Sequence, residues 1–302
     1  MDKFKQYIDA QWWKGVEKRE LENWIKNFDT NREIAELILD NVIFYNVSQL
    51  KAYTRFLISK LKEQVYTEAV RQNNFSFVDD SLLFDRWNEY LDRTAFLPAA
   101  KKGDSASSAY KIIGHWRSEL GRRDGACSTI SEIENKYNEG VRRFVLVDDF
   151  SGSGKQMKEV LKEKISFKGQ EIELGLLPDV VEDIQIVIAV YVIHEKSRKI
   201  LSGQYKKLKL IYVDLISENF NYLNERALIY EKYDDEKRQE IVREIKRITK
   251  TIVKSNQELS DLSSYVLNIP IVFEHGCPNN TLLLLFAHSE NWQQLFRRGI
   301  EL

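Results

Sequence analysis

The chain has 302 residues, of which 45 are basic and 46 acidic, so its net charge is −1. This balance argues against a surface that coats nucleic acid through general positive charge, although local patches remain open. Two cysteines, Cys127 and Cys277, are too few for a disulfide framework and favour a reducing cytoplasm. The sequence shows neither the roughly 20 consecutive apolar residues of a membrane-spanning helix nor the apolar core of a signal peptide at its start. We therefore expect a soluble, cytoplasmic protein without a membrane partner.

Residues 1–72 are predicted to form an N-terminal helical extension. Apolar residues recur at helical spacing in ELENWIKNF and in REIAELILDNVIFYNVSQLKAYTRFLISKL. We place a domain boundary after this extension, which leaves residues 73–302 as one α/β domain.

From about residue 93, predicted strands alternate with predicted helices. The strand candidates RTAFLPA, RRFVLVDD, DIQIVIAVYVI and KLKLIYVDLI are apolar along most of their length, and the segments AYKIIGHWRSELG, KQMKEVLKEK and HEKSRKILSGQ lie between them. A long charged helix is predicted over about residues 226–258, and NIPIVFEH and TLLLLFAH are predicted to close the chain as strands. Because continuously apolar strands are buried on both faces, the pattern predicts a mainly parallel sheet with helices on both sides.

The stretch VLVDDFSGSGKQ, residues 145–156, predicts a phosphate site of one of two kinds. A nucleoside-triphosphate P-loop needs a glycine five positions before its Gly-Lys pair and a Ser or Thr directly after the lysine. Here Asp149 and Gln156 occupy those positions. Since a carboxylate at the mouth of the loop would repel a phosphate, the sequence excludes a P-loop.

The second alternative is a grip on a ribose 5-phosphate. Asp148 and Asp149, at the end of an apolar strand, would accept hydrogen bonds from the ribose hydroxyls. Backbone N–H groups of the small-residue loop and of the following helix start would bind the 5′-phosphate. An ordinary strand-to-helix turn is the competing interpretation, and it is disfavoured because adjacent carboxylates on a buried strand are costly unless they serve a site. The expected phosphate-binding residues are Ser151, Gly152, Ser153 and Gly154, with Lys155 either adding charge or pointing to solvent.

FVLVDDFSGSG resembles the phosphoribosyl pyrophosphate (PRPP) binding motif of the type I phosphoribosyltransferases. It resembles more closely the PRTase-CE domains of bacterial conflict and anti-phage systems, which carry Asp-Asp-Phe-x-Gly-Ser-Gly and, near the C-terminus, Pro-Asn-Asn-Thr. Both motifs are present, at residues 148–154 and 278–281. The resemblance covers most of the chain and implies a type I phosphoribosyltransferase-like fold, in which Asp148 and Asp149 match the ribose-binding acids and residues 151–154 match the phosphate loop.

One departure from the family pattern leaves the ligand open. The usual enzymes have two threonines where Gly152 and Ser153 stand, and a Thr or Ser where Gln156 stands. PRPP, a nucleotide and another phosphorylated ribose are therefore alternative ligands.

Further site residues are expected beyond the carboxyl ends of the other strands, where open parallel sheets bind their ligands. His194 and Glu195 follow the third strand and Asp214 lies near the end of the fourth, without an assigned role. The loop after the first strand has the composition of a pyrophosphate loop, as the resemblance implies, or is an ordinary surface loop; its residues are Lys101, Lys102, Gly103, Asp104 and Ser105.

After the predicted strand NIPIVFEH, His275 with Asn279 and Asn280 is expected to bind a base or leaving group; alternatively, Pro-Asn-Asn is hairpin chemistry. His275 is the third catalytic candidate beside the two aspartates. We expect no protein-held metal site, because the sequence lacks zinc-ligand spacing. Mg²⁺ is expected only as the partner of a bound diphosphate.

Two classes of function follow. The first is an enzyme that transfers or cleaves at C1 of a phosphorylated ribose, in PRPP, a nucleotide or a nucleic acid. The resemblance implies a toxic effector in antiviral defence, such as a retron accessory protein whose restraining partner is a reverse transcriptase with its DNA–RNA product. The second is a non-catalytic nucleotide or PRPP sensor that keeps the ribose-phosphate grip.

Overall fold

The computed structural model of the chain describes residues 2–29, 31–74, 79–104, 107–121, 127–254, 267–289 and 291–298. The chain divides into two compact units, one made of Met1–Gln49 and Ile216–Leu302 and the other of Leu50–Leu215. The predicted boundary at residues 72 and 73 coincides with neither edge of these units. One helix, α4 (Val47–Gln72), runs up to that boundary, and nearly all of it belongs to the second unit.

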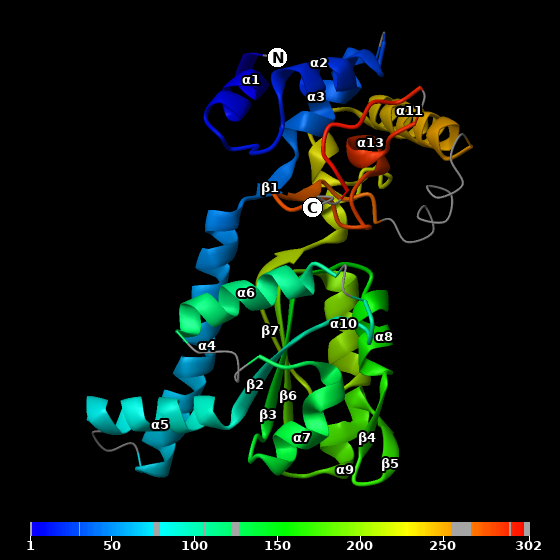
Figure 1. Cartoon of the computed structure of the whole chain (residues 1–302). Helices are drawn as coiled ribbons and strands as arrows, with labels where there is room; N and C mark the ends of the chain where they lie inside the picture. Colours follow the sequence, from blue (N-terminus) through cyan, green and yellow to red (C-terminus); the bar gives the residue numbers. More distant parts are fainter. Residues whose placement is uncertain are drawn as a thin grey trace. The chain divides into compact units, whose positions relative to one another are not determined.

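The second unit, residues 50–215, is built on a four-stranded sheet (Figure 1). Its strands are β2 (Thr94–Pro98), β3 (Arg143–Ser151), β6 (Gln185–His194) and β7 (Lys209–Ile216), in the order β2-β3-β6-β7. β3 is parallel to β2 on one side and to β6 on the other. The predicted α/β fold with a parallel sheet is therefore confirmed, and β3, which carries both aspartates, is an interior strand.

Helices connect and cover these strands. They are α5 (Asp80–Asp92), α6 (Ala109–Leu120), α7 (Ile133–Asn138), α8 (Lys155–Leu161), α9 (Leu177–Val180) and α10 (Glu195–Gln204). Short 3-10 turns occupy Ile130–Glu132 and Leu174–Leu176, and an antiparallel hairpin joins β4 (Lys164–Phe167) to β5 (Gln170–Glu173).

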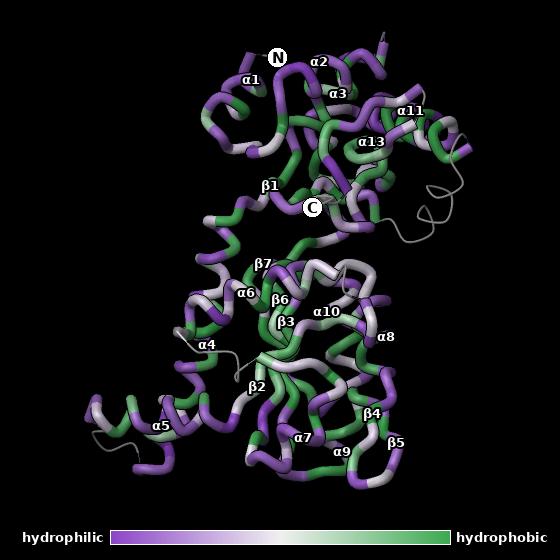
Figure 2. Tube along the Cα trace, in the orientation of Figure 1, coloured by the Kyte–Doolittle hydropathy of each residue, from purple (hydrophilic) through white to green (hydrophobic). Residues whose placement is uncertain are grey.

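The sheet is buried on both faces. On one face, Leu146 and Ile188 form a core with Met157 of α8 and Leu201 of α10. On the other face, Phe96 packs against Trp116 of α6, with ring centroids 5.2 Å apart. Each fully buried apolar side chain contributes about 1.5–3 kcal/mol, which explains why β3 and β6 are hydrophobic along most of their length (Figure 2).

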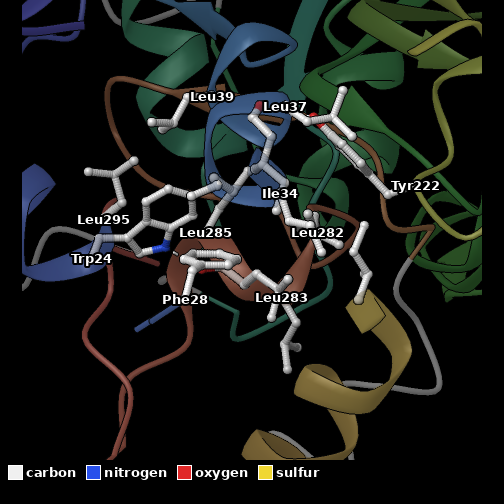
Figure 3. Close-up of a cluster of buried hydrophobic side chains, with 14 of the residues drawn as sticks. Trp24, Phe28, Ile34, Leu37, Leu39, Tyr222, Leu282, Leu283, Leu285 and Leu295 are labelled. Carbon is white, nitrogen blue, oxygen red and sulfur yellow. Dashed lines mark hydrogen bonds between the residues drawn. The ribbon is translucent and has the colours of Figure 1, made fainter. Parts of the chain in front are cut away.

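The first unit combines the N-terminal and C-terminal segments. Its elements are α1 (Asp2–Asp9), α2 (Lys18–Lys26), α3 (Arg32–Asp40), β1 (Ile43–Tyr45), α11 (Asp235–Lys254), β8 (Ile271–Phe273) and α13 (Leu283–Phe286), with 3-10 turns at Glu218–Phe220 and Leu228–Tyr230. Figure 3 shows residues distant in sequence, such as Trp24, Tyr222 and Leu285, gathered in one apolar cluster. The indole N–H of Trp24 donates to the carbonyl oxygen of Leu284 at 2.6 Å.

Three predictions of secondary structure are wrong. Residues 1–72 are not wholly helical, because β1 separates α3 from α4. TLLLLFAH contains the short helix α13 rather than a strand, since an apolar run this short does not distinguish a buried strand from a buried helix. The strand predicted in NIPIVFEH is confirmed as β8, which pairs with β1 and not with the four-stranded sheet.

The charged helix begins at Asp235 instead of about residue 226, because the carboxylate of Asp234 caps it by accepting from the Lys237 N–H at 2.8 Å. Residues 255–258 of that prediction lie outside the described part of the chain. Among the described helices, none combines the length and the apolar character needed to cross a membrane.

Candidate functional site

The two aspartates lie in β3, beyond the reach of its neighbour β2. The last register pair between these strands joins Pro98 to Val147. β3 continues through residues 148–151 and stays paired with β6, from Asp148 with Val190 to Ser151 with Ile193. The strand thus ends later than predicted, because β6 supplies partners as far as Ile193.

The carboxylates of Asp148 and Asp149 are almost fully buried, with exposed fractions of 2% and 5%. The hydroxyl of Ser108, at the N-terminal end of α6, donates to Asp149 Oδ1 at 2.9 Å. Asp148 Oδ1 accepts from the backbone N–H of Asp149 at 3.0 Å. The Ser108 contact places Asp149 next to α6, and the side chain of Asp148 interacts with that of Asp149.

Burial raises the pKa of the Asp148 carboxyl well above its usual range, and the neighbouring Asp149 raises it further. Two carboxylates this close cannot both ionise at low cost in a buried position. Strongly perturbed carboxyls of this kind are typical of functional sites and, less often, of structural networks.

Residues 151–154 form a turn between β3 and α8, called here the 151–154 turn. Gly154 has a φ of 76°, in the left-handed region that favours glycine. Gly152 and Gly154 are buried and Ser153 is half-buried, with its Oγ 3.4 Å from the N–H of Lys155, which is exposed. The hydroxyl oxygens of Ser151 and Ser197 of α10 lie 2.7 Å apart, so one donates to the other. The turn therefore packs against α10.

The loop after β2 carries the predicted pyrophosphate-binding residues. Lys101 Nζ forms an ion pair with Glu159 Oε2 of α8 at 2.6 Å, and Lys102 and Asp104 are exposed. The N–H of Asp104 donates to the carbonyl of Lys101 at 3.1 Å, which closes a turn around Gly103. Ser105 lies outside the described residues. Lys101 is thus engaged with a carboxylate of its own unit.

His194 and Asp214 were considered because they lie near the carboxyl ends of predicted strands. In the structure, both side chains form hydrogen bonds within the protein. His194 is fully buried and caps α10, its Nδ1 accepting from the N–H of Lys196 at 3.2 Å. Asp214 accepts a hydrogen bond from the hydroxyl of Tyr53. Glu195 Oε2 is 3.9 Å from Lys199 Nζ.

His275, Asn279 and Asn280 belong to the first unit, residues 1–49 and 216–302. The ring of His275 stacks on Phe273, with centroids 5.3 Å apart. Asn279 Oδ1 accepts from Arg298 at 3.1 Å, and the N–H of Thr281 donates to the carbonyl of Pro278 at 3.0 Å. The Pro-Asn-Asn-Thr segment therefore forms a tight turn, but it does not connect two strands of a hairpin, because it leads into the helix α13. Its role in binding stays a prediction.

Ser108 and Ser197 were not anticipated as part of the site. Ser108 stood in a polar run before a predicted helix, where a serine is typical of a cap. Ser197 stood inside a predicted helix, three residues after a strand end, and no local signal linked it to the 151–154 turn. The pairing of β3 with β2 brings Ser108 near Asp149, and the pairing of β3 with β6 brings Ser197 to the turn.

Within the described residues, no group of three or more His, Cys, Asp or Glu side chains is placed to hold a metal ion. Asp148 and Asp149 place two carboxyl groups side by side at the end of β3. Mg²⁺ binds through one or two carboxylates together with phosphate oxygens, so these residues fit a magnesium ion that arrives with a diphosphate.

Comparison with protein families gives a match over most of the chain. A family model described as PRTase-CE matches residues 21–298, a span that includes both aspartates, the 151–154 turn and the Pro-Asn-Asn-Thr segment. Neither the curated proteins nor the solved structures contain a match to this chain.

Proposed function

The chain belongs to the PRTase-CE family, and we propose that its phosphoribosyltransferase-like domain binds a phosphorylated ribose and acts at C1 of the sugar. Asp148 and Asp149 would accept hydrogen bonds from the 2- and 3-hydroxyls. The 151–154 turn would hold the 5-phosphate through backbone N–H groups and the hydroxyl of Ser153.

The observation that carries this proposal is the burial of two adjacent carboxyls on an interior strand. Both are at least 95% buried, and the pKa of Asp148 is raised by burial and by its neighbour. Keeping an ionisable carboxyl group in a buried position is costly. A chain that keeps two of them, directly before a turn with a left-handed glycine, supports a binding role for them.

The chemistry at C1 follows from charge. The bond between C1 and its leaving group, a diphosphate or a base, breaks with the electron pair leaving on that group, and a nucleophile adds to C1. Positive charge develops on C1 and the ring oxygen, and nearby carboxylates stabilise it. Magnesium, bound to the diphosphate, would supply charge neutralisation of the leaving group.

One observation favours the non-catalytic sensor as a second candidate. Lys101, the cation best placed by sequence to hold a pyrophosphate, is ion-paired with Glu159. A protein that grips the ribose and its 5-phosphate without holding pyrophosphate would bind ligand without turnover.

Mass spectrometry separates these two candidates. Purified protein is incubated with PRPP, NAD and nucleoside triphosphates, with and without magnesium. An enzyme produces pyrophosphate, free base or ribose 5-phosphate, and the products disappear in the Asp148→Asn, Asp149→Asn double variant. Binding without any product identifies the sensor, and the absence of both binding and product contradicts the proposed function.

The role in antiviral defence is part of the proposal. An effector of this kind, released from a restraining partner, would deplete nucleotides or modify a nucleic acid. Expression without the partner should then arrest growth, and the double asparagine variant should relieve the arrest. Equal arrest by both proteins would separate toxicity from the acidic pair.

A further inference from the structure

The 151–154 turn is held from the side of α10 by one buried contact. Ser151 is 5% exposed and Ser197 is fully buried, and their hydroxyl oxygens are 2.7 Å apart. Ser151 also pairs in register with Ile193, two residues before α10 begins. The start of α10 is thus fixed to the end of β3 by both backbone and side-chain contacts.

Gly154, at the other end of the turn, also touches Ser197. A Cβ atom placed on Gly154 would lie 3.2 Å from both the Cα and the Oγ of Ser197. This distance is shorter than ordinary van der Waals contact, so the turn and α10 approach each other at backbone level. Ser197 therefore contacts the first and the last residue of the turn.

The two serines of the Ser-Gly-Ser-Gly segment are in different positions. The hydroxyl of Ser151 is buried against Ser197, whereas Ser153 is half-buried and lies between the two glycines. Buried hydroxyls are nearly always hydrogen-bonded, and loss of one partner leaves the other unsatisfied. The Ser151 hydroxyl is therefore used in a buried hydrogen bond with Ser197, and Ser153 carries the hydroxyl that is available to a ligand.

We propose that Ser197 is a positioning residue, which acts through the Ser151 hydroxyl to hold the 151–154 turn in the geometry that binds the 5-phosphate. Ser153 then supplies the hydroxyl that contacts the phosphate. This inference rests on the proposed function, and it assigns Ser151 a role that differs from direct phosphate binding.

A double-mutant cycle tests the coupling between the two hydroxyls. The affinity for ribose 5-phosphate is measured by calorimetry for Ser151→Ala, Ser197→Ala and the double variant, at a temperature well below the melting point of each. We expect each single change to weaken binding about tenfold and the double change to add little, because both remove the same contact. Ser153→Ala should weaken binding additively with either, and Ser166→Ala, at an exposed position on β4, should leave the affinity unchanged.

Hydrogen exchange in the absence of ligand provides a second measurement. The amides of residues 152–154 should exchange faster in Ser151→Ala and in Ser197→Ala than in the wild type and in Ser166→Ala. Unchanged affinity and unchanged exchange in the two variants would overturn the positioning role, as would a lower melting temperature with no change in affinity. If the wild type itself fails to bind ribose 5-phosphate, the proposed function fails, and this inference fails with it.

Discussion

At the scale of single residues, Asp148 carries a conflict between stability and function. Its carboxyl is 2% exposed, and burial with the adjacent Asp149 raises its pKa. In the unfolded chain an aspartate has a pKa of about 3.9. Between that value and the raised folded value, the folded protein binds a proton that the unfolded chain does not. Stability therefore falls as the pH rises through this interval, and the full cost is present above it.

Replacing Asp148 with asparagine should remove this cost. We expect Asp148→Asn to melt at a higher temperature than the wild type at pH 8, with a difference that shrinks as the pH approaches 4. Thermal unfolding followed by circular dichroism at several pH values measures the effect. The variant should bind ribose 5-phosphate more weakly at pH 8 despite its greater stability.

Asp85→Asn is the matched control, because Asp85 is exposed on α5. The same substitution there should change the melting temperature little at any pH. If Asp148→Asn is less stable than the wild type at pH 8, the carboxylate of Asp148 is a structural partner rather than a buried group kept for a ligand.

At the scale of elements, glycine can be required at a turn for two reasons: a positive φ, or the close approach of a neighbouring element. The contact between the 151–154 turn and α10 allows the two reasons to be tested separately. Gly154 and Gly169 have the same φ of 76°, but only Gly154 has a neighbour, Ser197, within 4 Å of where a Cβ would lie. Replacing either glycine with alanine strains the backbone by about 1 kcal/mol. At position 154 the alanine also pushes on α10, and such overpacking costs roughly a further 1–3 kcal/mol.

The expected outcome is a larger loss of unfolding free energy for Gly154→Ala than for Gly169→Ala, measured by urea denaturation. Binding of ribose 5-phosphate should weaken only in Gly154→Ala, because Gly169 lies in the β4–β5 hairpin away from the turn. Equal losses of stability in the two variants would mean that α10 yields to the added methyl group.

The sequence predicted the elements whose side chains are buried in a simple pattern. The continuous apolar runs of β2, β3 and β6 and the helical spacing of α6 and α10 are local signals, and Gly121 ends α6 with a φ of 59°, as expected of a closing glycine. α13 was not predicted, because four buried leucine and phenylalanine side chains carry no periodicity. Contacts such as Ser151 with Ser197 span 46 residues and depend on strand pairing, so no local pattern reveals them.

At the scale of the whole molecule, the chain folds into two compact units. It passes from the first unit to the second near the start of α4 and returns to the first at the end of β7. Residues 216–302 pack with residues 1–49, as Trp24 and Leu284 illustrate, so the sequence predicted neither unit's limits. A helical extension and a single domain were expected because helical spacing ends near residue 72. The acidic pair and the 151–154 turn belong to one unit, and this unit carries the proposed grip on ribose phosphate.

Calorimetry with ribose 5-phosphate and with PRPP tests the central claim most directly. The wild type should bind both, whereas the Asp148→Asn, Asp149→Asn double variant should bind at least one of them with an affinity about 100-fold lower or worse. Each charge-assisted hydrogen bond to a ribose hydroxyl contributes roughly 1.5–3 kcal/mol, and the substitution preserves side-chain volume. A double variant that folds normally and binds both ligands as tightly as the wild type and the Asp85→Asn control would contradict the assignment of this site.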